Sequence, residues 1–376
     1  MHRLSFFLLL SLALATHTMA ESIDVWIGTS NSKLSQGIYH CTLDTSTGKL
    51  SEASLAAEIS GPGFLALHPS LPVLYAVGTL EGRPSVVAYQ IKRLGSKPSL
   101  DLLGSAEIGD GGAAHVEVDP TGHTLMTAQY GGGSVGVFSL NADGSIRERT
   151  QLIKHQGGAK VVGNRQDSPH AHWVGFSPDN RFAFAPDLGL DQVAIYKLDA
   201  EKSHIVPHGA GAVPPGGGPR HMKFHQNGRW IYVLNELALS VSQFDYDPAE
   251  GTMKLRNTIP AVPQAALDKE LFKSASEIRI HPNGRFAYSA NRGHDTITAY
   301  RIDPKNGDLT VIEIENVRSA TPRNFNLDPS GKWLVVGGQD SHTLASFAVN
   351  SETGELTYNQ SIQHVPSPIC VLFDAE

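Results

Sequence analysis

The chain has 376 residues, of which 37 are acidic and 30 are basic, so its formal net charge is −7. This balance lacks the excess of basic residues that is typical of a nucleic-acid-binding protein. The acidic residues are scattered singly along the chain and form no interaction tail. The length alone favours two domains, yet no linker or change of composition divides the chain.

The N-terminus has the pattern of an export signal. His2 and Arg3 precede an apolar run over 4–15, which ends in small residues before Ala20. A run of this kind is shorter than the roughly 20 residues that a membrane-spanning helix needs. We therefore expect residues 1–20 to be a signal peptide and residues 21–376 to be a single exported domain without a membrane anchor. Its removal changes the net charge to −8, because the segment holds one basic and no acidic residue.

A short turn motif recurs six times along the rest of the chain. Most copies begin with His, Asp or Ser, followed by Pro or Gln and, two residues later, by Gly or Asn. The copies are 47 to 58 residues apart, a spacing that fits one four-stranded propeller blade. The copies begin at His68, Asp119, Ser177, His225, His281 and Asp328.

Strands are expected on both sides of each turn. In the copy around His225, we expect four strands over 222–224, 230–234, 240–246 and 253–258. Amphipathic helical patterns are nearly absent, and the one candidate, 265–273, fits an insertion between blades. The sequence therefore predicts an all-β protein.

The two ends of the chain supply the strands of one more blade. Segments 25–28, 38–43 and 55–59 provide three strands, and 369–373 provides the innermost one. The prediction is a seven-bladed β-propeller closed by N- and C-terminal strands that share one blade, which leaves no exposed sheet edge. No edge or coiled-coil seam argues for an oligomer, so we expect a monomer.

The same topology places the two cysteines of the chain. Cys41 and Cys370 fall on strands of the shared blade that are separated by a third strand. The spacing of roughly 9 to 10 Å exceeds the limit of about 7 Å between the Cα atoms of a disulfide. We expect two free, mostly buried thiols, although export would permit a disulfide.

Two positions of each blade should face one common surface, because the innermost strand begins at the rim where the second strand ends. With the second residue of each copy as its anchor, the residues that stand six positions before the anchors are Gly63, Ala114, His172, Arg220, Ser276 and Arg323. Ten residues after the anchors stand Thr79, Tyr130, Leu188, Glu236, Arg292 and Gln339.

Four of these positions form the candidate catalytic group, namely His172, Arg220, Glu236 and Arg292. So much charge in matched register on adjacent blades favours a concave binding site at the mouth of the central channel. Residues beside the group are candidate substrate-binding residues: His170, His221, Asn235, Glu277, Asn291, Gln129 and Tyr130. Taken alone, His221, Asn291 or Arg323 is more typical of a structural tie between blades than of a binding site.

Other kinds of site lack support in the sequence. His170 and His172 have the spacing of metal ligands, but Arg220 and Arg292 would repel the ion. The Gly-rich segments 131–133 and 216–218 do not join a strand to a helix, and no serine has a nucleophile elbow. We expect neither metal nor cofactor nor covalent intermediate.

The motifs Pro-His-Ala-His at 169–172, Pro-Arg-His at 219–221, Asn-Glu at 235–236 and Asn-Arg-Gly at 291–293 resemble those of the seven-bladed lactonases. That family includes propeller-type 6-phosphogluconolactonases and carboxymuconate-lactonizing cyclases. The resemblance covers residues 23–376 and implies that the four candidate catalytic residues hydrolyse a lactone.

Export separates this chain from the cytosolic, phosphorylated substrate of that family. We therefore expect a periplasmic gluconolactonase that converts glucono-δ-lactone to gluconate, with 6-phosphogluconolactonase, a carboxymuconate-type cyclase and a non-catalytic binding propeller as alternatives. Arg220 and Arg292 would bind the oxyanion and the product carboxylate. His172 is the better candidate for the base, because two arginines would lower the pKa of Glu236, although the sequence leaves both roles open.

Overall fold

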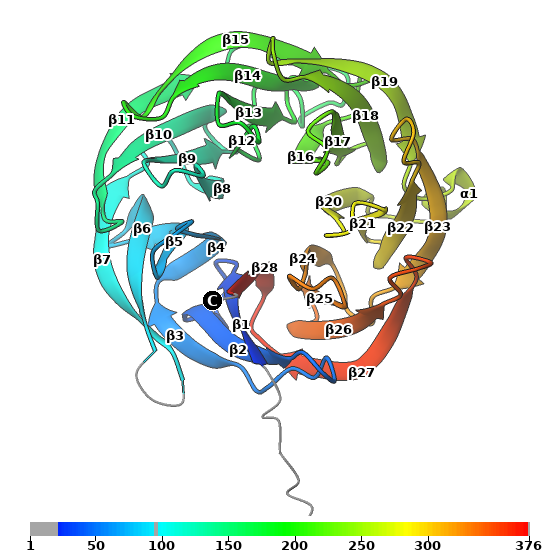
Figure 1. Ribbon diagram of the computed structural model, residues 1–376, viewed down its shortest axis with the longest axis horizontal. Helices are drawn as coiled ribbons and strands as arrows, with labels where there is room; N and C mark the ends of the chain where they lie inside the picture. Colours follow the sequence, from blue (N-terminus) through cyan, green and yellow to red (C-terminus); the bar gives the residue numbers. More distant parts are fainter. Residues whose placement is uncertain (1–21, 94–96, 375–376) are drawn as a thin grey trace, which may run out of the picture.

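Seven four-stranded antiparallel sheets form a ring of blades around a central axis (Figure 1). The computed structural model describes residues 22–93 and 97–374, and nearly all of its regular structure is β-strand. The prediction of an all-β, seven-bladed propeller is confirmed. The expected signal peptide, residues 1–20, lies outside the described residues.

The blades follow one another along the chain. Within each blade, the four strands are arranged in order from the central axis outward. From the inside outward, blade 1 contains β28 (Pro368–Asp374), β1 (Ser22–Thr29), β2 (Gly37–Asp44) and β3 (Ser54–Glu58). Blade 2 contains β4 (Ser60–Leu67), β5 (Val73–Leu80), β6 (Arg83–Lys92) and β7 (Ser99–Glu107). Blade 3 contains β8 (Ala113–Val118), β9 (Thr124–Gln129), β10 (Ser134–Leu140) and β11 (Ile146–Lys154).

The second half of the ring repeats this order. Blade 4 contains β12 (Gly175–Phe176), β13 (Phe182–Asp187), β14 (Gln192–Asp199) and β15 (His204–Ala212). Blade 5 contains β16 (Pro219–Phe224), β17 (Trp230–Asn235), β18 (Ser240–Asp247) and β19 (Thr252–Pro260). Blade 6 contains β20 (Ser274–Ile280), β21 (Phe286–Arg292), β22 (Thr296–Ile302) and β23 (Leu309–Asn316). Blade 7 contains β24 (Pro322–Leu327), β25 (Trp333–Gly338), β26 (Thr343–Val349) and β27 (Leu356–His364).

The ring is closed in blade 1, where the last strand of the chain pairs with the first. β28 runs antiparallel to β1 along most of its length, with Asp374 opposite Asp24 and Cys370 opposite Gly28. The buried indole of Trp26 donates a hydrogen bond of 2.9 Å to Asp374. The predicted closure by the two ends of the chain is therefore confirmed.

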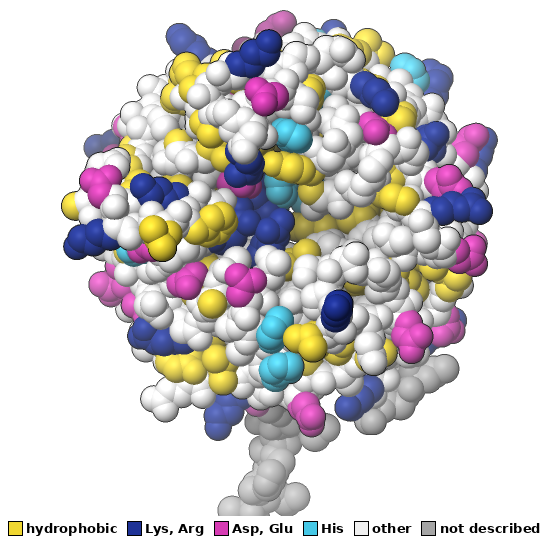
Figure 2. All heavy atoms as spheres, turned by 180° about the vertical axis from the view of Figure 1, so that it is seen from behind, with side chains coloured by type: hydrophobic (Ala, Val, Ile, Leu, Met, Phe, Trp, Pro, Cys, Tyr) yellow, Lys and Arg dark blue, Asp and Glu magenta, His cyan; other side chains and the backbone are white. Residues whose placement is uncertain are grey.

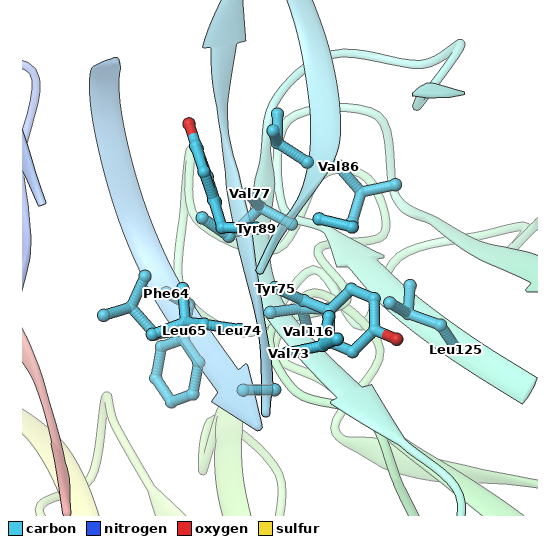
Figure 3. Packing of buried hydrophobic residues seen from close by; sticks show 14 of the residues in the cluster. Phe64, Leu65, Val73, Leu74, Tyr75, Val77, Val86, Tyr89, Val116 and Leu125 are labelled. Atoms are coloured by element: carbon cyan, nitrogen blue, oxygen red, sulfur yellow. The ribbon is translucent and has the colours of Figure 1, made fainter. Parts of the chain in front are cut away.

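Apolar side chains fill the spaces between blades. Figure 3 shows one such core, in which Phe64, Val77 and Val86 of blade 2 lie with Val116 and Leu125 of blade 3. Because side chains of a strand point alternately to its two faces, each blade packs against both neighbours. A fully buried valine or leucine contributes roughly 1.5–3 kcal/mol, so packing between blades is a major part of the stability.

The recurring turns also join neighbouring blades. The imidazoles of His225 and His281 donate hydrogen bonds of 2.9 Å to the carbonyls of Gly284 and Gly331 in the next turn along the ring. Gly331 has a φ of +74°, and a Cβ there would lie 2.6 Å from the ring of His281. The repeated His and Gly of the motif are thus the two partners of one contact between blades.

The predicted helix over 265–273 is only partly present. α1 covers Gln264–Leu267, and the residues that follow form turns and bends. The N-cap position is Pro263, whose side chain makes no capping hydrogen bond, so the short helix lacks a common source of stability. The insertion between blades 5 and 6 is present as predicted.

The two cysteines of the chain are free and buried, as predicted. Cys41 lies on β2 and Cys370 on β28, with β1 between them. Burial raises the pKa of each thiol to about 12. Both groups are therefore protonated and unreactive in the folded protein.

We predict that a thiol reagent such as dithionitrobenzoate labels no cysteine in the native protein and two per chain after denaturation without reductant. The reason is that both thiols are buried within a closed blade and are not bonded to each other. Denatured protein that needs reductant before it reacts would show a disulfide and contradict this arrangement.

Candidate active site

A β-bulge at the start of the innermost strands turns side chains towards one face of the ring. In β16, the pairing with β17 shifts between Pro219 and His221, which leaves Arg220 as the extra residue. In β24, the pairing with β25 shifts in the same way and leaves Arg323. Bulges commonly redirect a side chain beside an active site. Of the six positions that stand six residues before a turn, all but Ser276 line the pocket at this face.

The second strands of the blades supply the opposite wall. Tyr130 and Glu236 come directly after β9 and β17, and Arg292 is the last residue of β21. Backbone hydrogen bonds hold Glu236 on both sides, from its own N–H to Gly218 O at 2.7 Å and from Ala275 N–H to its carbonyl at 3.0 Å. The carboxylate is thus fixed between blades 5 and 6.

These residues line a pocket of about 580 Å³ at this end of the central channel. Figure 2 shows the face opposite to that of Figure 1, where Lys and Arg side chains gather in a hollow near the centre. All four candidate catalytic residues lie in the pocket wall. The lining residues are Gly63, Phe64, Gly112, Ala113, Ala114, Tyr130, Gly131, Arg165, His172, Arg220, His221, Glu236, Phe272, Ser274, Arg292, Arg323, Asn324 and Ile369.

Glu236 forms ion pairs with three arginines. Its Oε2 lies 3.0 Å from Arg220 Nε and 3.3 Å from Arg292 Nη2, and its Oε1 lies 2.7 Å from Arg165 Nη2. Burial by itself raises the pKa of Glu236, but Arg292 and Arg220 outweigh it and hold that pKa well below its usual range. Glu236 is therefore ionised at neutral pH and a poor proton acceptor.

The arginines keep their charge despite burial. Burial and the neighbouring Arg292 lower the pKa of Arg220 to about 9 and that of Arg323 to about 10. Both guanidinium groups are therefore cationic at neutral pH. With Arg165 and Arg292, the pocket wall holds four arginines against one carboxylate, that of Glu236. The pocket is suited to an anion or to an oxygen atom that gains negative charge.

His172 is the one group of the four with an uncommitted side chain. Its imidazole makes no side-chain hydrogen bond among the described residues, and its Nδ1 is buried without a partner. The ring contacts those of Tyr130 and His221 at centroid distances of 5.5 and 5.3 Å. Burial, and then Arg220, lower the pKa of His172 well below its usual range. The imidazole is therefore neutral at neutral pH and one of its ring nitrogens has a free lone pair, although the same shift makes it a weaker base than an exposed histidine.

A buried network lies directly below Arg220. Arg220 Nη1 donates to His221 Nε2 at 3.1 Å, and His221 Nδ1 lies 3.1 Å from Glu277 Oε1. Because a guanidinium only donates and a carboxylate only accepts, these contacts fix the proton of a neutral His221 on Nδ1. Glu277 also accepts a hydrogen bond of 2.6 Å from Asn324. His221 reaches the pocket wall, whereas Glu277 is fully buried beneath it.

Five of the seven expected substrate-binding residues do not line the pocket, which corrects the prediction. Gln129, Asn235 and Asn291 are fully buried, and their side chains point into their own blades. Asn235 donates to Ser240 at 3.0 Å and to Ser242 at 2.8 Å, and Asn291 likewise bonds threonines of β22. Each directly precedes a pocket residue along the chain, so its side chain faces the other way.

His170 also lies outside the pocket wall, but it supports a residue that lines it. Its ring stacks on Tyr130 at a centroid distance of 4.5 Å, and its Nδ1 lies 2.7 Å from the Tyr130 carbonyl. Of the seven expected substrate-binding residues, the structure therefore brings Tyr130 and His221 to the pocket and leaves His170 and Glu277 in contact with pocket residues.

Arg165 is a pocket residue that the sequence pattern did not indicate. It lies on the long loop after β11, where no strand register applies, and it donates to Tyr130 Oη at 3.2 Å as well as to Glu236. The next residue, the fully buried Gln166, anchors the loop through hydrogen bonds of 2.9 Å to Leu188 O and 2.6 Å to Asp191. A buried glutamine beside an arginine in a long loop is a weak signal in sequence alone.

The insertion between blades 5 and 6 supplies the other unexpected pocket residues. Phe272 is half exposed, and the guanidinium of Arg292 lies 5.9 Å from the centre of its ring. Ser274 accepts a hydrogen bond of 2.5 Å from Arg292 Nη2. These contacts fix Arg292 at the rim of the pocket.

The described residues contain no group of three or more His, Cys, Asp or Glu side chains that could hold a metal ion. None of the helices in the described part of the chain is long and apolar enough to cross a membrane. The chemistry available in the pocket is that of a neutral imidazole beside several guanidinium groups. Such a site can take a proton from water and stabilise an oxyanion, as hydrolysis of an ester requires.

Comparison with known proteins agrees with this chemistry. The family described as "Lactonase, 7-bladed beta-propeller" matches residues 24–373. A 6-phosphogluconolactonase of Bacillus subtilis is 34% identical over 348 residues, which cover 93% of this chain and 97% of that protein. A 6-phosphogluconolactonase of Formosa agariphila is 33% identical, covering 87% of this chain and 92% of its own.

A solved structure shares the fold over nearly the whole chain. The periplasmic gluconolactonase PpgL of Pseudomonas aeruginosa superposes with a TM-score of 0.86 at 28% identity, covering 94% of this chain and 99% of its own. The family match and the curated relatives together show a lactone-hydrolysing enzyme. The chain therefore belongs to the family of seven-bladed β-propeller lactonases.

Proposed function

We propose that this enzyme opens the lactone of a sugar acid, converting glucono-δ-lactone to gluconate. The observation that carries the proposal is a neutral His172 in the same pocket wall as Arg220 and Arg292, all three side chains being buried. A gluconolactone is an ester that already opens in water, so one base and a few cationic groups supply enough acceleration.

In the proposed reaction, His172 accepts a proton from the water that attacks the lactone carbonyl. The carbonyl oxygen gains negative charge, which Arg220 and Arg292 stabilise. When the tetrahedral intermediate collapses, the bond from the carbonyl carbon to the ring oxygen breaks, and that oxygen takes the proton from the imidazolium. The acid that forms loses its proton and leaves as a carboxylate. Glu236 holds the arginines in place and stays ionised.

The proposed location is the periplasm. The signal-like pattern of residues 1–20 supports it, as does the similarity to a neighbour that is itself a periplasmic gluconolactonase. Outside the cytosol, the available gluconolactone would be unphosphorylated, which is why glucono-δ-lactone is our first choice of substrate.

A phosphorylated lactone is the second candidate, and the charge of the pocket favours it. Four arginines face one carboxylate, an excess of three positive charges, whereas a neutral lactone gains only one negative charge on opening. Arg165 and Arg323 make few contacts and lie beside the catalytic group, so they are available to a phosphate. Curated relatives named 6-phosphogluconolactonase support the same candidate.

We predict that the mature protein releases acid from glucono-δ-lactone faster than spontaneous hydrolysis does. Arg220→Ala should lower kcat by about 10²–10³-fold, because it removes an oxyanion donor. Glu236→Ala should cause a comparable loss by freeing the arginines that it holds. A pH-stat assay checks both, with the exposed Arg147→Ala as the matched control that keeps the full rate.

The same assay with the 6-phosphorylated lactone separates the two candidate substrates. A preference for the phosphorylated lactone, reduced selectively by Arg165→Met, would establish the second candidate and contradict the first. A panel that includes a carboxymuconate lactone tests the remaining enzymatic alternative. Ligand binding without any hydrolysis above background would instead indicate a binding propeller.

The pH dependence of hydrolysis tests the role of His172. Because burial and Arg220 lower the pKa of His172, the base stays unprotonated down to acidic pH. We predict that kcat/KM shows no inflection near pH 6.5 and falls only at a pH well below it. Arg323→Met removes another charge that lowers this pKa, and it should move the acid limb to higher pH. An acid limb that keeps its position in Arg323→Met and survives in His172→Gln would show that another group is the base.

A further inference from the structure

The central channel has a second cavity, at the end opposite to the active-site pocket. β8 begins at the pocket with Ala113 and ends at this cavity with Glu117 and Val118. β16 runs the same way, from Arg220 in the pocket to Lys223 in the cavity. The cavity measures about 210 Å³, room for about seven water molecules. The residues that line it are Glu117, Val118, Pro120, Trp173, Gly175, Phe176, Met222, Lys223 and Phe224.

Two side chains of opposite charge line this cavity without a direct contact between them. Among the described residues, Glu117 and Lys223 form neither an ion pair nor a hydrogen bond between side chains, either together or with a third side chain. The nearest defined contact is that of the Lys223 ammonium with the ring of Trp173, at 5.2 Å. Arg279, which lies nearby, is committed to Glu277 at 3.3 Å. Removing charged groups from water without pairing them is costly, so a carboxylate and an ammonium that line one cavity without a direct contact are open to a ligand.

The remaining wall is apolar and aromatic. Met222, Val118 and Trp173 are buried, and Phe176 and Phe224 are partly exposed at the cavity. The blade of β12 leaves this space because its innermost strand has only two residues, Gly175–Phe176, where the neighbouring inner strands have six. An apolar wall with a few placed polar groups is the usual make-up of a small-molecule site.

Burial shifts the pKa of both groups against their charged forms, and the opposite charges nearby offset the shifts only in part. Burial raises the pKa of Glu117, and burial together with Arg279 lowers the pKa of Lys223 to about 8. Both shifts disfavour the charged forms. An ammonium beside Glu117 and a carboxylate beside Lys223 would reverse both shifts and stabilise the two charges.

We propose that this second cavity binds a small zwitterion with an apolar body, such as an α-amino acid with an apolar side chain. Its ammonium pairs with Glu117, its carboxylate pairs with Lys223, and its side chain packs on Trp173. The site is separate from the lactonase pocket, because the two lie at opposite ends of the same inner strands.

Isothermal titration calorimetry of the mature protein tests the proposal with L-leucine and three analogues that each lack one feature. L-leucinamide has no carboxylate, N-acetyl-L-leucine has no ammonium, and glycine has no apolar side chain. We expect millimolar or tighter binding of leucine, and binding at least about tenfold weaker for each analogue. An analogue that binds as tightly as leucine, or leucine that does not bind at millimolar concentration, overturns the proposal.

Variants locate the bound amino acid. Glu117→Gln and Lys223→Met should each weaken leucine binding by at least about tenfold, whereas the exposed Glu201→Gln and Lys254→Met serve as matched controls and should not. Arg292→Ala, which alters the lactonase pocket, should bind leucine like the unaltered protein. Equal binding by Glu117→Gln, or loss of binding in Arg292→Ala, would place leucine elsewhere and contradict the assignment. Because the comparison of analogues uses the unaltered chain, it remains decisive if a variant fails to fold.

Discussion

The carboxylate of Glu236 is the interaction on which the active-site pocket depends. It is the one acidic group in the pocket wall, as far as the described residues show, and it pairs with arginines from three different parts of the chain: Arg165 from a loop, Arg220 from blade 5 and Arg292 from blade 6. Without it, these largely buried cations would repel one another. Glu236 thus gathers the cationic groups that a developing oxyanion needs, and the same contacts keep it from acting as a base.

That arrangement requires a closed ring. Arg220 and Arg292 lie on adjacent blades, and their spacing is set by packing between blades and by the His–Gly contacts of the turns. Closure by β28 and β1 holds the whole circle to one geometry. A propeller therefore places charged groups rigidly around an axis, although they lie far apart in sequence.

The ring and most of the charged residues of the pocket could be predicted from the sequence, because both follow a repeat. Counting from the turns found His172, Arg220, Glu236 and Arg292, although it could not show that Arg220 is a bulged residue. The extension of this count to neighbouring residues was wrong for Asn235 and Asn291. Their side chains point into their blades, because alternate residues of a strand face opposite sides. Arg165 and Phe272 lie on insertions, where position in the repeat carries no information.

The inner strands explain how one ring can carry two different sites. In β8, β16 and β24, the bulge at the start of the strand presents one residue to the pocket, and later residues of β8 and β16 reach the second cavity. In β16 these are Arg220 at one end and Lys223 at the other. The buried pair of His221 and Glu277 lies between them, held by hydrogen bonds with Arg220 and Asn324. The lactonase pocket and the second cavity can therefore differ in charge and ligand while sharing the same strands.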